Sequence, residues 1–213
     1  MKAGGDIFND LFDEFTLWAI LVGIFTFSWL FHHSLKYRSK DGSDNNIDNL
    51  TPGVFPVEND DLKLEVTWTV VPFILIVYLT FISWGPLDEI WTEDEDAHIV
   101  TITASQWSWS FDCSEVNNTD ICDSSQTMDV EGRSNVILSL KAGESYTFIL
   151  YSEDVTHSPF FVDWGIKEDA QPGQETRMYY TPSTDEIGTN LLYCAEYCGD
   201  DHGYMTAIIE VHA

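Results

Sequence analysis

Two long runs of apolar residues in the first half of the chain dominate its hydropathy pattern. Residues 15–35 and residues 66–87 contain no Asp, Glu, Lys or Arg, and charged residues flank both runs. A helix needs about 20 residues to cross the roughly 30 Å apolar core of a bilayer. Tryptophans lie near the ends of both runs, where an aromatic belt would place them. The pattern predicts transmembrane helices at 15–35 and 66–87, and two such runs disfavour buried helices of a soluble protein.

The distribution of basic residues predicts the orientation of this hairpin. The loop 36–65 holds Lys36, Arg38, Lys40 and Lys63, four of the nine Lys and Arg residues of the chain. Positive charge stays on the cytoplasmic side of a membrane. We therefore expect a cytoplasmic loop, with the segment 1–14 and the region 88–213 outside the plasma membrane. The first residues carry acids rather than a basic n-region, so the first helix is expected to be a retained anchor.

After residue 88 the pattern changes to short stretches rich in β-branched and aromatic residues, separated by turns. These stretches predict strands at 98–104, 135–140, 145–151, 177–181 and 204–211. A turn is expected at 141–144 and another at Pro172-Gly173. No long helical periodicity occurs in this half of the sequence. The region is long enough for one domain with its own core, and an all-β Greek-key barrel is the predicted fold.

The charge balance excludes one class of partner. The chain has 36 acidic and 9 basic residues, a formal net charge of −27, and 25 of the acids lie in residues 86–213. Binding of nucleic acid needs Lys and Arg to neutralise phosphates, so no nucleic-acid partner is expected. A hydrophobic content of 44% argues against disorder. Such an excess of carboxylates resembles the composition of proteins from salt-loving organisms.

Soft metal ligands are concentrated in one short segment near the end of the chain. Cys194, Cys198, His202 and Met205 fall within twelve residues, and His157 lies upstream in Asp-Val-Thr-His-Ser. Thiolate, imidazole and thioether donors suit copper. One tetrahedral zinc would leave some of them unused, whereas two coppers sharing both sulfurs would use them all. A disulfide between the two cysteines is the alternative, but it leaves the spacing of the other two side chains unexplained.

The order Cys-x-Glu-x-Cys-x3-His-x2-Met, preceded by Asp-x-x-His-Ser, resembles the binuclear copper A centre of subunit II of the haem–copper oxygen reductases, the cytochrome c oxidase type. The resemblance implies a cupredoxin-like β domain. It also implies six ligands, among which Glu196 acts through its main-chain carbonyl: His157, Cys194, Glu196, Cys198, His202 and Met205.

Three further segments resemble this family. In Gln106-Trp-Ser-Trp-Ser-Phe, the resemblance implies that Trp107 passes electrons inward from the donor; the alternative is a tryptophan that only packs a strand. In Glu65-Val-Thr-Trp, it implies that Glu65 stands at the mouth of a proton channel; the alternative is a solvated boundary residue. Residues 167–170 and the carboxylate of Glu196 are implied to lie near a magnesium ion shared with subunit I, since magnesium prefers hard oxygen ligands.

The resemblance implies a subunit that carries electrons and does not itself make or break substrate bonds. It would take single electrons from a cytochrome c or a membrane-held blue-copper protein and pass them to haem in subunit I, where oxygen is reduced to water. The alternatives are the copper subunit of a nitric oxide reductase and a membrane-tethered copper assembly protein.

Cys113 and Cys122 lie outside the family's pattern. The sequence leaves two alternatives for them, a disulfide between the two residues or two free thiols.

Overall fold

The computed structural model describes residues 4–38, 53, 60–116, 118–130 and 132–213, without the side chains of 4–6. Most of the predicted cytoplasmic loop, including Lys40, and the first three residues of the segment 1–14 lie outside the described residues. The chain divides into two compact units, Leu11–Trp84 and Met1–Asp10 with Gly85–Ala213. Each unit is described by itself.

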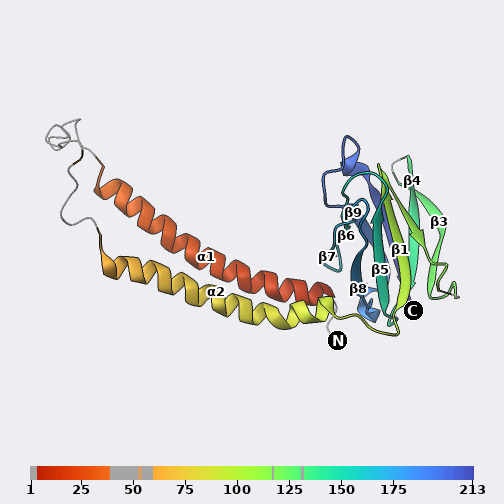
Figure 1. The fold of residues 1–213 in the computed structure, drawn as a ribbon, viewed down its shortest axis with the longest axis horizontal. Coiled ribbons are helices and arrows are strands. Elements are labelled where there is room, and N and C mark those ends of the chain that lie inside the picture. Colours follow the sequence, from red (N-terminus) through yellow and green to blue (C-terminus); the bar gives the residue numbers. More distant parts are fainter. Residues whose placement is uncertain (1–3, 39–52, 54–59, 117, 131) are drawn as a thin grey trace. The chain divides into compact units, whose positions relative to one another are not determined.

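Two helices, α1 (Gly4–Lys36) and α2 (Leu62–Trp91), contain the two uncharged runs and extend beyond them (Figure 1). A helix does not end where charge begins, because Glu and Lys are themselves good helix formers. The carboxylate of Asp61 caps the start of α2 by accepting hydrogen bonds from the Lys63 and Leu64 amides, both 3.1 Å long. The carboxylate of Glu14 on α1 accepts a hydrogen bond of 2.8 Å from the Tyr78 hydroxyl on α2.

The helices expose apolar rather than polar surface. In α2, which the structure describes completely, no residue is buried. Phe25 and Phe31 of α1 and Phe81 of α2 are 67%, 62% and 81% exposed. Both helices are long and apolar enough to cross a bilayer. Apolar surface of this extent needs lipid or another protein to cover it, which fits a membrane protein.

The second unit contains two β-sheets that face each other (Figure 1). The four-stranded sheet has the order β2-β1-β5-β8 and the six-stranded sheet has the order β3-β4-β10-β9-β6-β7. The first sheet consists of β1 (His98–Ser105), β2 (Ser108–Asp112), β5 (Tyr146–Ser152) and β8 (Thr176–Tyr180). The second consists of β3 (Cys122–Val130), β4 (Arg133–Lys141), β6 (Pro159–Phe161), β7 (Ile166–Lys167), β9 (Gly188–Cys194) and β10 (Thr206–His212).

Alternating residues fill the space between the sheets. Val100, Ile102 and Ala104 of β1 are fully buried while their neighbours are partly exposed, and β2 buries Trp109 and Phe111 in the same way. This is the period-2 pattern of strands that pack one face on a core. Two of the pairings, β1 with β5 and β10 with β4, are parallel, so the chain crosses between the sheets.

The predicted fold class, an apolar helix pair followed by a cupredoxin-like β domain, is confirmed, with the β domain formed as a two-sheet sandwich. All five predicted strands are present within two residues of their expected bounds. The last one starts at Thr206 rather than at 204, because His202–Tyr204 form a 3-10 turn, η3.

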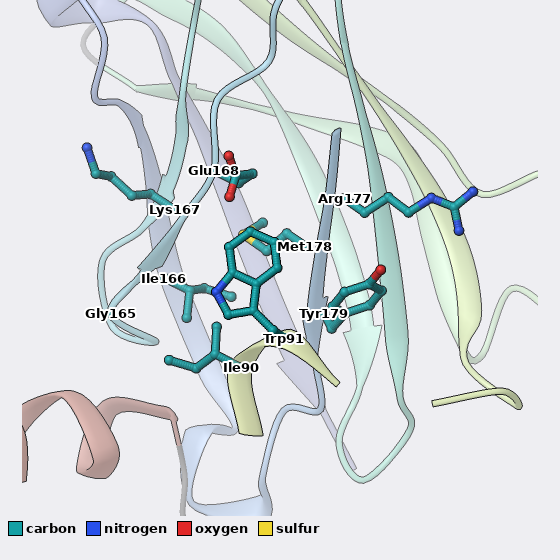
Figure 2. Close-up of a pocket in the computed structure, with 9 residues that line it drawn as sticks. All are labelled: Ile90, Trp91, Gly165, Ile166, Lys167, Glu168, Arg177, Met178 and Tyr179. Atoms are coloured by element: carbon teal, nitrogen blue, oxygen red, sulfur yellow. The ribbon is translucent and has the colours of Figure 1, made fainter. Parts of the chain in front are cut away.

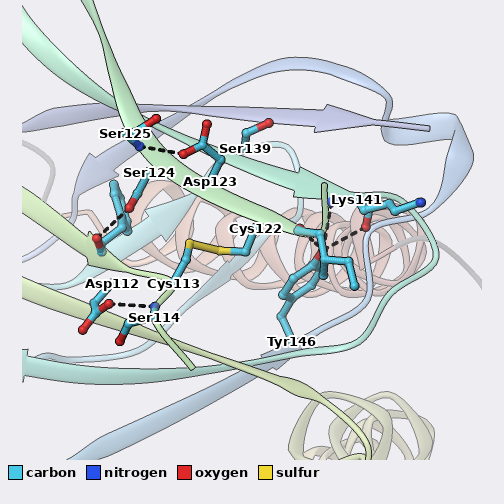
Figure 3. The surroundings of a disulfide bond; sticks show 12 residues. Asp112, Cys113, Ser114, Cys122, Asp123, Ser124, Ser125, Ser139, Lys141 and Tyr146 are labelled. Carbon is cyan, nitrogen blue, oxygen red and sulfur yellow. Dashed lines mark hydrogen bonds between the residues drawn. A yellow bond between two sulfur atoms is a disulfide. The ribbon is translucent and has the colours of Figure 1, made fainter. Parts of the chain in front are cut away.

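Cys113 and Cys122 form a disulfide that joins the segment after β2 to the start of β3 (Figure 3). Nearby, the buried Tyr146 hydroxyl donates a hydrogen bond of 2.7 Å to the Ile121 carbonyl and accepts one of 2.8 Å from the Lys141 amide. Burial raises the pKa of Tyr146 to about 12, so the hydroxyl keeps its proton at neutral pH. Together these links fix the edge of the sandwich where the two sheets meet.

Replacing Cys113 and Cys122 together by alanine is expected to lower the free energy of unfolding of the β domain by about 2.5–3 kcal/mol, because a cross-link over a short loop restricts the unfolded chain. The sequence separation of the two cysteines is 9. Urea unfolding of the full chain in detergent, followed by tryptophan fluorescence, measures the change. An unfolding midpoint equal to that of the unchanged protein would contradict it.

Candidate metal centre

Three neighbouring segments bring the predicted ligands together at one end of the sandwich. β9 ends at Cys194, and the chain returns through η3 into β10, so that the Cys194 amide donates a hydrogen bond of 3.1 Å to the Met205 carbonyl. β6 pairs with β9 through Pro159 opposite Cys194, which places His157 beside the same loop. Residues that are 37 positions apart therefore become neighbours because of strand pairing, not because of local sequence.

The side chains converge on the two sulfur atoms. The Sγ atoms of Cys194 and Cys198 are 3.8 Å apart, far longer than the roughly 2.05 Å of a disulfide, so both thiols are free. Nδ1 of His157 lies 3.8 Å from the first sulfur, and Nδ1 of His202 lies 3.5 Å from the second. The Met205 Sδ is 3.8 Å from Cys198 Sγ, and the Glu196 carbonyl oxygen is 3.2 Å from Cys194 Sγ.

His157 presents one ring nitrogen to the sulfurs and uses the other to bind Asp154. Its Nε2 lies 2.8 Å from Asp154 Oδ1. A carboxylate can only accept, so Nε2 carries a proton, and in the neutral ring Nδ1 is the nitrogen whose lone pair faces the thiols. Partial desolvation raises the pKa of Asp154, but hydrogen bonds from His157 and from the Gln106 and Val155 amides outweigh it and hold that pKa below its usual range.

The centre is closed on one side and open on the other. His157, Cys194, Cys198 and Met205 are buried, whereas His202 is only partly buried. Burial raises the pKa of the Cys198 thiol to about 12, and the neighbouring Cys194 thiol adds to the shift. In the metal-free protein this thiol is protonated at neutral pH. A metal that binds here must therefore displace a proton, as thiolate-binding metals do.

The turn between β1 and β2 covers the Cys198 peptide. The Gln106 side-chain amide donates a hydrogen bond of 2.6 Å to the Cys198 carbonyl, and the Trp107 indole N–H donates one of 3.1 Å to the same oxygen. Trp107 lies in this turn and packs against the core, while Trp109 follows in β2 and donates to the Met205 carbonyl at 3.3 Å. Neither Gln106 nor Asp154 was among the predicted site residues.

The side-chain carboxylates of Glu196 and Glu65, for which roles apart from copper binding were predicted, lie in different elements. Glu196 is partly buried in the loop after β9, and Glu65 is partly exposed in the first turn of α2. Ser158 connects the ligand loop with the predicted magnesium segment: its hydroxyl donates a hydrogen bond of 3.0 Å to the Glu168 carbonyl, and its own carbonyl accepts one of 2.8 Å from the Ala195 amide. The main-chain segments that carry Glu168 and Glu196 are thus linked through one residue.

A shallow cleft of about 180 Å³ lies beside the end of α2 in the unit that contains the β domain. Figure 2 shows Trp91 at its centre, with Glu168 and Arg177 among the surrounding side chains. None of the six predicted ligands, all of which the structure describes, lines this cleft. The metal centre is therefore separate from this cleft.

The donor set fits copper in a shared site. His157 Nδ1 and the two cysteine sulfurs all lie within 4.8 Å of one another and are buried. The two sulfurs are near enough to bond to the same metal at thiolate bond lengths of about 2.3 Å. With two imidazoles, a thioether and a carbonyl also directed at the sulfurs, the site offers more donors than one tetrahedral ion uses. Soft sulfur and imidazole donors in this number favour copper.

Comparisons with known proteins give consistent findings. The family model described as the periplasmic domain of cytochrome C oxidase subunit II matches residues 98–212. Cytochrome c oxidase subunit 2 of Artemia franciscana is 30% identical over 166 residues, which cover 71% of this chain and 68% of that protein. The subunit 2 of Alkalihalophilus pseudofirmus is 30% identical over 191 residues, 87% of this chain and 49% of that protein, so the chain spans about half the length of this relative.

Among solved structures, the periplasmic domain of subunit II of cytochrome oxidase of Bradyrhizobium japonicum is similar at 22% identity with a TM-score of 0.46. The similarity covers 57% of this chain and 88% of that one.

Proposed function

The chain belongs to the cytochrome c oxidase subunit II family, and from this premise we propose that it is the electron-accepting subunit of a terminal respiratory oxidase. It takes single electrons from a small redox protein and passes them to haem in subunit I, where oxygen is reduced to water. The observation that carries the proposal is the convergence of two imidazoles, a thioether and a main-chain carbonyl on two free thiols.

We propose that these residues hold a binuclear copper centre. When bound, the copper pair supplies one-electron redox chemistry with the charge shared over both metals. The thiols of Cys194 and Cys198 would hold the copper as thiolates and would stabilise its reduced state, because sulfur is a soft donor. His157, oriented by Asp154, and His202 add one imidazole each. Met205 and the Glu196 carbonyl complete the set, and burial excludes water from the sulfurs.

Electron uptake is proposed to run through Trp107. This side chain is partly buried, and its indole N–H contacts the Cys198 carbonyl at 3.1 Å. The contact links an aromatic ring at the rim of the centre to the peptide that carries a ligand. This supports an uptake role over that of a tryptophan that only packs a strand.

The membrane arrangement is proposed from charge and burial. The hairpin spans the plasma membrane with the loop inside, and both chain ends and the copper domain outside, as the positive-inside rule predicts. Glu65, in the first turn of α2, then lies at the cytoplasmic edge, where it is proposed to stand at the mouth of a proton channel in subunit I. The carboxylate of Glu196 is proposed to face a magnesium ion shared with subunit I, since its segment is joined to Glu168 through Ser158.

The electron donor is proposed to be a cytochrome c or a membrane-held blue-copper protein. A domain with 25 acidic and four basic residues attracts a basic donor at low ionic strength. If the acid excess reflects a salt-loving source, this attraction is largely screened, because the Debye length at 1 M salt is about 3 Å. Tethering to the membrane then replaces electrostatic steering with a high local concentration.

Copper analysis of the purified full chain tests the proposed function. Two coppers per chain, with the electron-spin-resonance signal of one electron shared by two copper nuclei, are expected. A single copper that is released reversibly would support a copper assembly protein instead. The haem types that copurify with the intact complex, and whether it reduces oxygen or nitric oxide, separate the oxidase from a nitric oxide reductase.

Replacing Met205 by leucine is expected to retain both coppers but to shift the reduction potential of the centre and slow electron transfer to haem. Leucine is close to methionine in volume, so the change removes the thioether donor with little effect on packing. Redox titration of the copper absorption, together with copper content, measures both effects. Loss of one copper per chain would show that Met205 is essential for binding rather than for tuning.

A further inference from the structure

The Gln106–Trp107 turn is bonded to two ligand-bearing segments at once. At one end, the Gln106 backbone amide donates a hydrogen bond of 2.7 Å to Asp154 Oδ2. At the other end, the Gln106 side chain and the Trp107 indole donate to the Cys198 carbonyl at 2.6 and 3.1 Å. Gln106 is therefore the residue whose main chain contacts one segment and whose side chain contacts the other.

The Asp154 end of this arrangement reaches His157. The two oxygens of the carboxylate have different partners, since Oδ2 accepts from Gln106 and Oδ1 accepts from His157 Nε2 at 2.8 Å. Both oxygens are thus fixed, and the Asp154 carboxylate cannot rotate without losing one of the hydrogen bonds that it accepts. The orientation of the fully buried His157 ring depends on the turn through one intervening side chain.

The turn occupies both acceptor positions of the Cys198 carbonyl oxygen. A carbonyl oxygen has two lone pairs, and the two donors of the turn occupy both. The next residue, Gly199, has a φ of +119°, and a Cβ placed there would lie 3.0 Å from Gln106 Nε2 and 3.1 Å from Trp107 Cζ2. The close approach of the turn to Cys198 therefore requires a glycine at position 199.

We infer that Gln106 is a positioning residue of the metal centre, which fixes the His157 ring and the Cys198 peptide relative to each other and holds the Trp107 indole on the same carbonyl. For its effect on the metal, the inference rests on the proposed copper function. The alternative is a turn that is bonded to these groups only to complete the fold, with no influence on the centre.

The inference predicts the direction of a redox effect. The positive ends of two N–H dipoles point at the Cys198 carbonyl, close to a sulfur ligand, and favour the state of the centre with less positive charge, which is the reduced state. Removing the Gln106 donor is expected to lower the reduction potential. Replacing it by a carboxylate, which cannot donate when ionised and adds negative charge, is expected to lower it further.

The test compares Gln106→Ala, Gln106→Glu and Gly199→Ala in the full chain, with Ser108→Ala as control. Ser108 lies directly after the same turn, and its hydroxyl is 3.3 Å from that of Ser105. In metal-free protein, exchange of the Trp107 indole N–H is measured by nuclear magnetic resonance. Loss of the Gln106 hydrogen bonds, which hold the turn on the Cys198 carbonyl, is expected to speed exchange of the Trp107 indole N–H roughly fivefold. This factor corresponds to about 1 kcal/mol, at 1.4 kcal/mol per factor of ten. In copper-loaded protein, the reduction potential and copper content are measured.

We expect the reduction potential to fall in Gln106→Ala and to fall further in Gln106→Glu, with two coppers retained. A lowered reduction potential is also expected in Gly199→Ala. Exchange rates and potentials equal to those of Ser108→Ala in all three variants would overturn the inference. If the unchanged protein takes up no copper pair, the proposed function fails, while the exchange rates still decide whether Gln106 holds the turn on the Cys198 carbonyl. If copper binds normally but the potential does not respond, the positioning role fails and the proposed function stands.

Discussion

Replacing Cys198 by serine is expected to eliminate the proposed binuclear copper centre, leaving at most one weakly held copper per chain. The Cys198 sulfur lies within 3.8 Å of Cys194 Sγ, His202 Nδ1 and Met205 Sδ, so it contacts three other donor atoms of the cluster, as the Cys194 sulfur does. A hydroxyl is a hard, poorly acidic donor that would hold copper much more weakly than a thiolate does. Copper content and the visible absorption spectrum of the purified chain measure the loss.

The double alanine variant at Cys113 and Cys122 is the matched control for that experiment. It also removes two sulfurs from the same domain, but these are joined in a disulfide between the segment after β2 and the start of β3. This control is expected to keep two coppers and an unchanged spectrum. A serine variant at position 198 with two coppers and the spectrum of the unchanged protein would show that the ligand assignment is wrong.

Replacing Trp107 by leucine is expected to slow electron uptake from the donor about tenfold or more, which corresponds to about 1.4 kcal/mol or more in activation free energy. The change removes both the aromatic ring and the indole hydrogen bond to the Cys198 carbonyl. Stopped-flow oxidation of the donor, repeated in multimolar salt to suppress electrostatic attraction, measures the rate. The copper spectrum and the reaction of pre-reduced enzyme with oxygen are expected to remain unchanged.

A phenylalanine at position 107 separates the two contributions of this tryptophan. Phenylalanine retains an aromatic ring but donates no hydrogen bond, so an intermediate rate is expected if both the ring and the N–H matter. Donor oxidation at the rate of the unchanged protein in the leucine variant would identify Trp107 as a packing residue. Electrons would then reach the centre elsewhere on its partly exposed side, near His202.

Short-range sequence patterns predicted the long helices and the proximity of the ligand candidates to one another. Five of the six ligand candidates lie within twelve residues, and the loop between β9 and β10 keeps them together whatever the rest of the fold does. The helices follow from uninterrupted apolar composition. The strands β4 and β5 were also clear, because Val, Ile, Leu and aromatic residues form dense blocks there.

Features that depend on long-range pairing could not be read from the sequence. The bond from Gln106 to the Cys198 carbonyl spans 92 positions, and nothing local identifies either group as the partner of the other. β9, with the sequence Gly-Thr-Asn-Leu-Leu-Tyr-Cys, has weak strand character and is fixed by its neighbours β6 and β10. Asp154 was visible beside His157 in the motif, but its role as acceptor for that ring requires the structure.

The position of β10 in the six-stranded sheet has a consequence for biogenesis. β10 lies between β4 and β9, and it is synthesised after the other strands that the structure describes. The ribosome must therefore release residues 206–212 before the sheet can close, and until then β4 and β9 present unpaired edges that invite wrong pairing. Met205, directly before β10, reaches its place at the same moment. Metal binding at the proposed centre therefore has to follow the insertion of β10 and the closure of the six-stranded sheet.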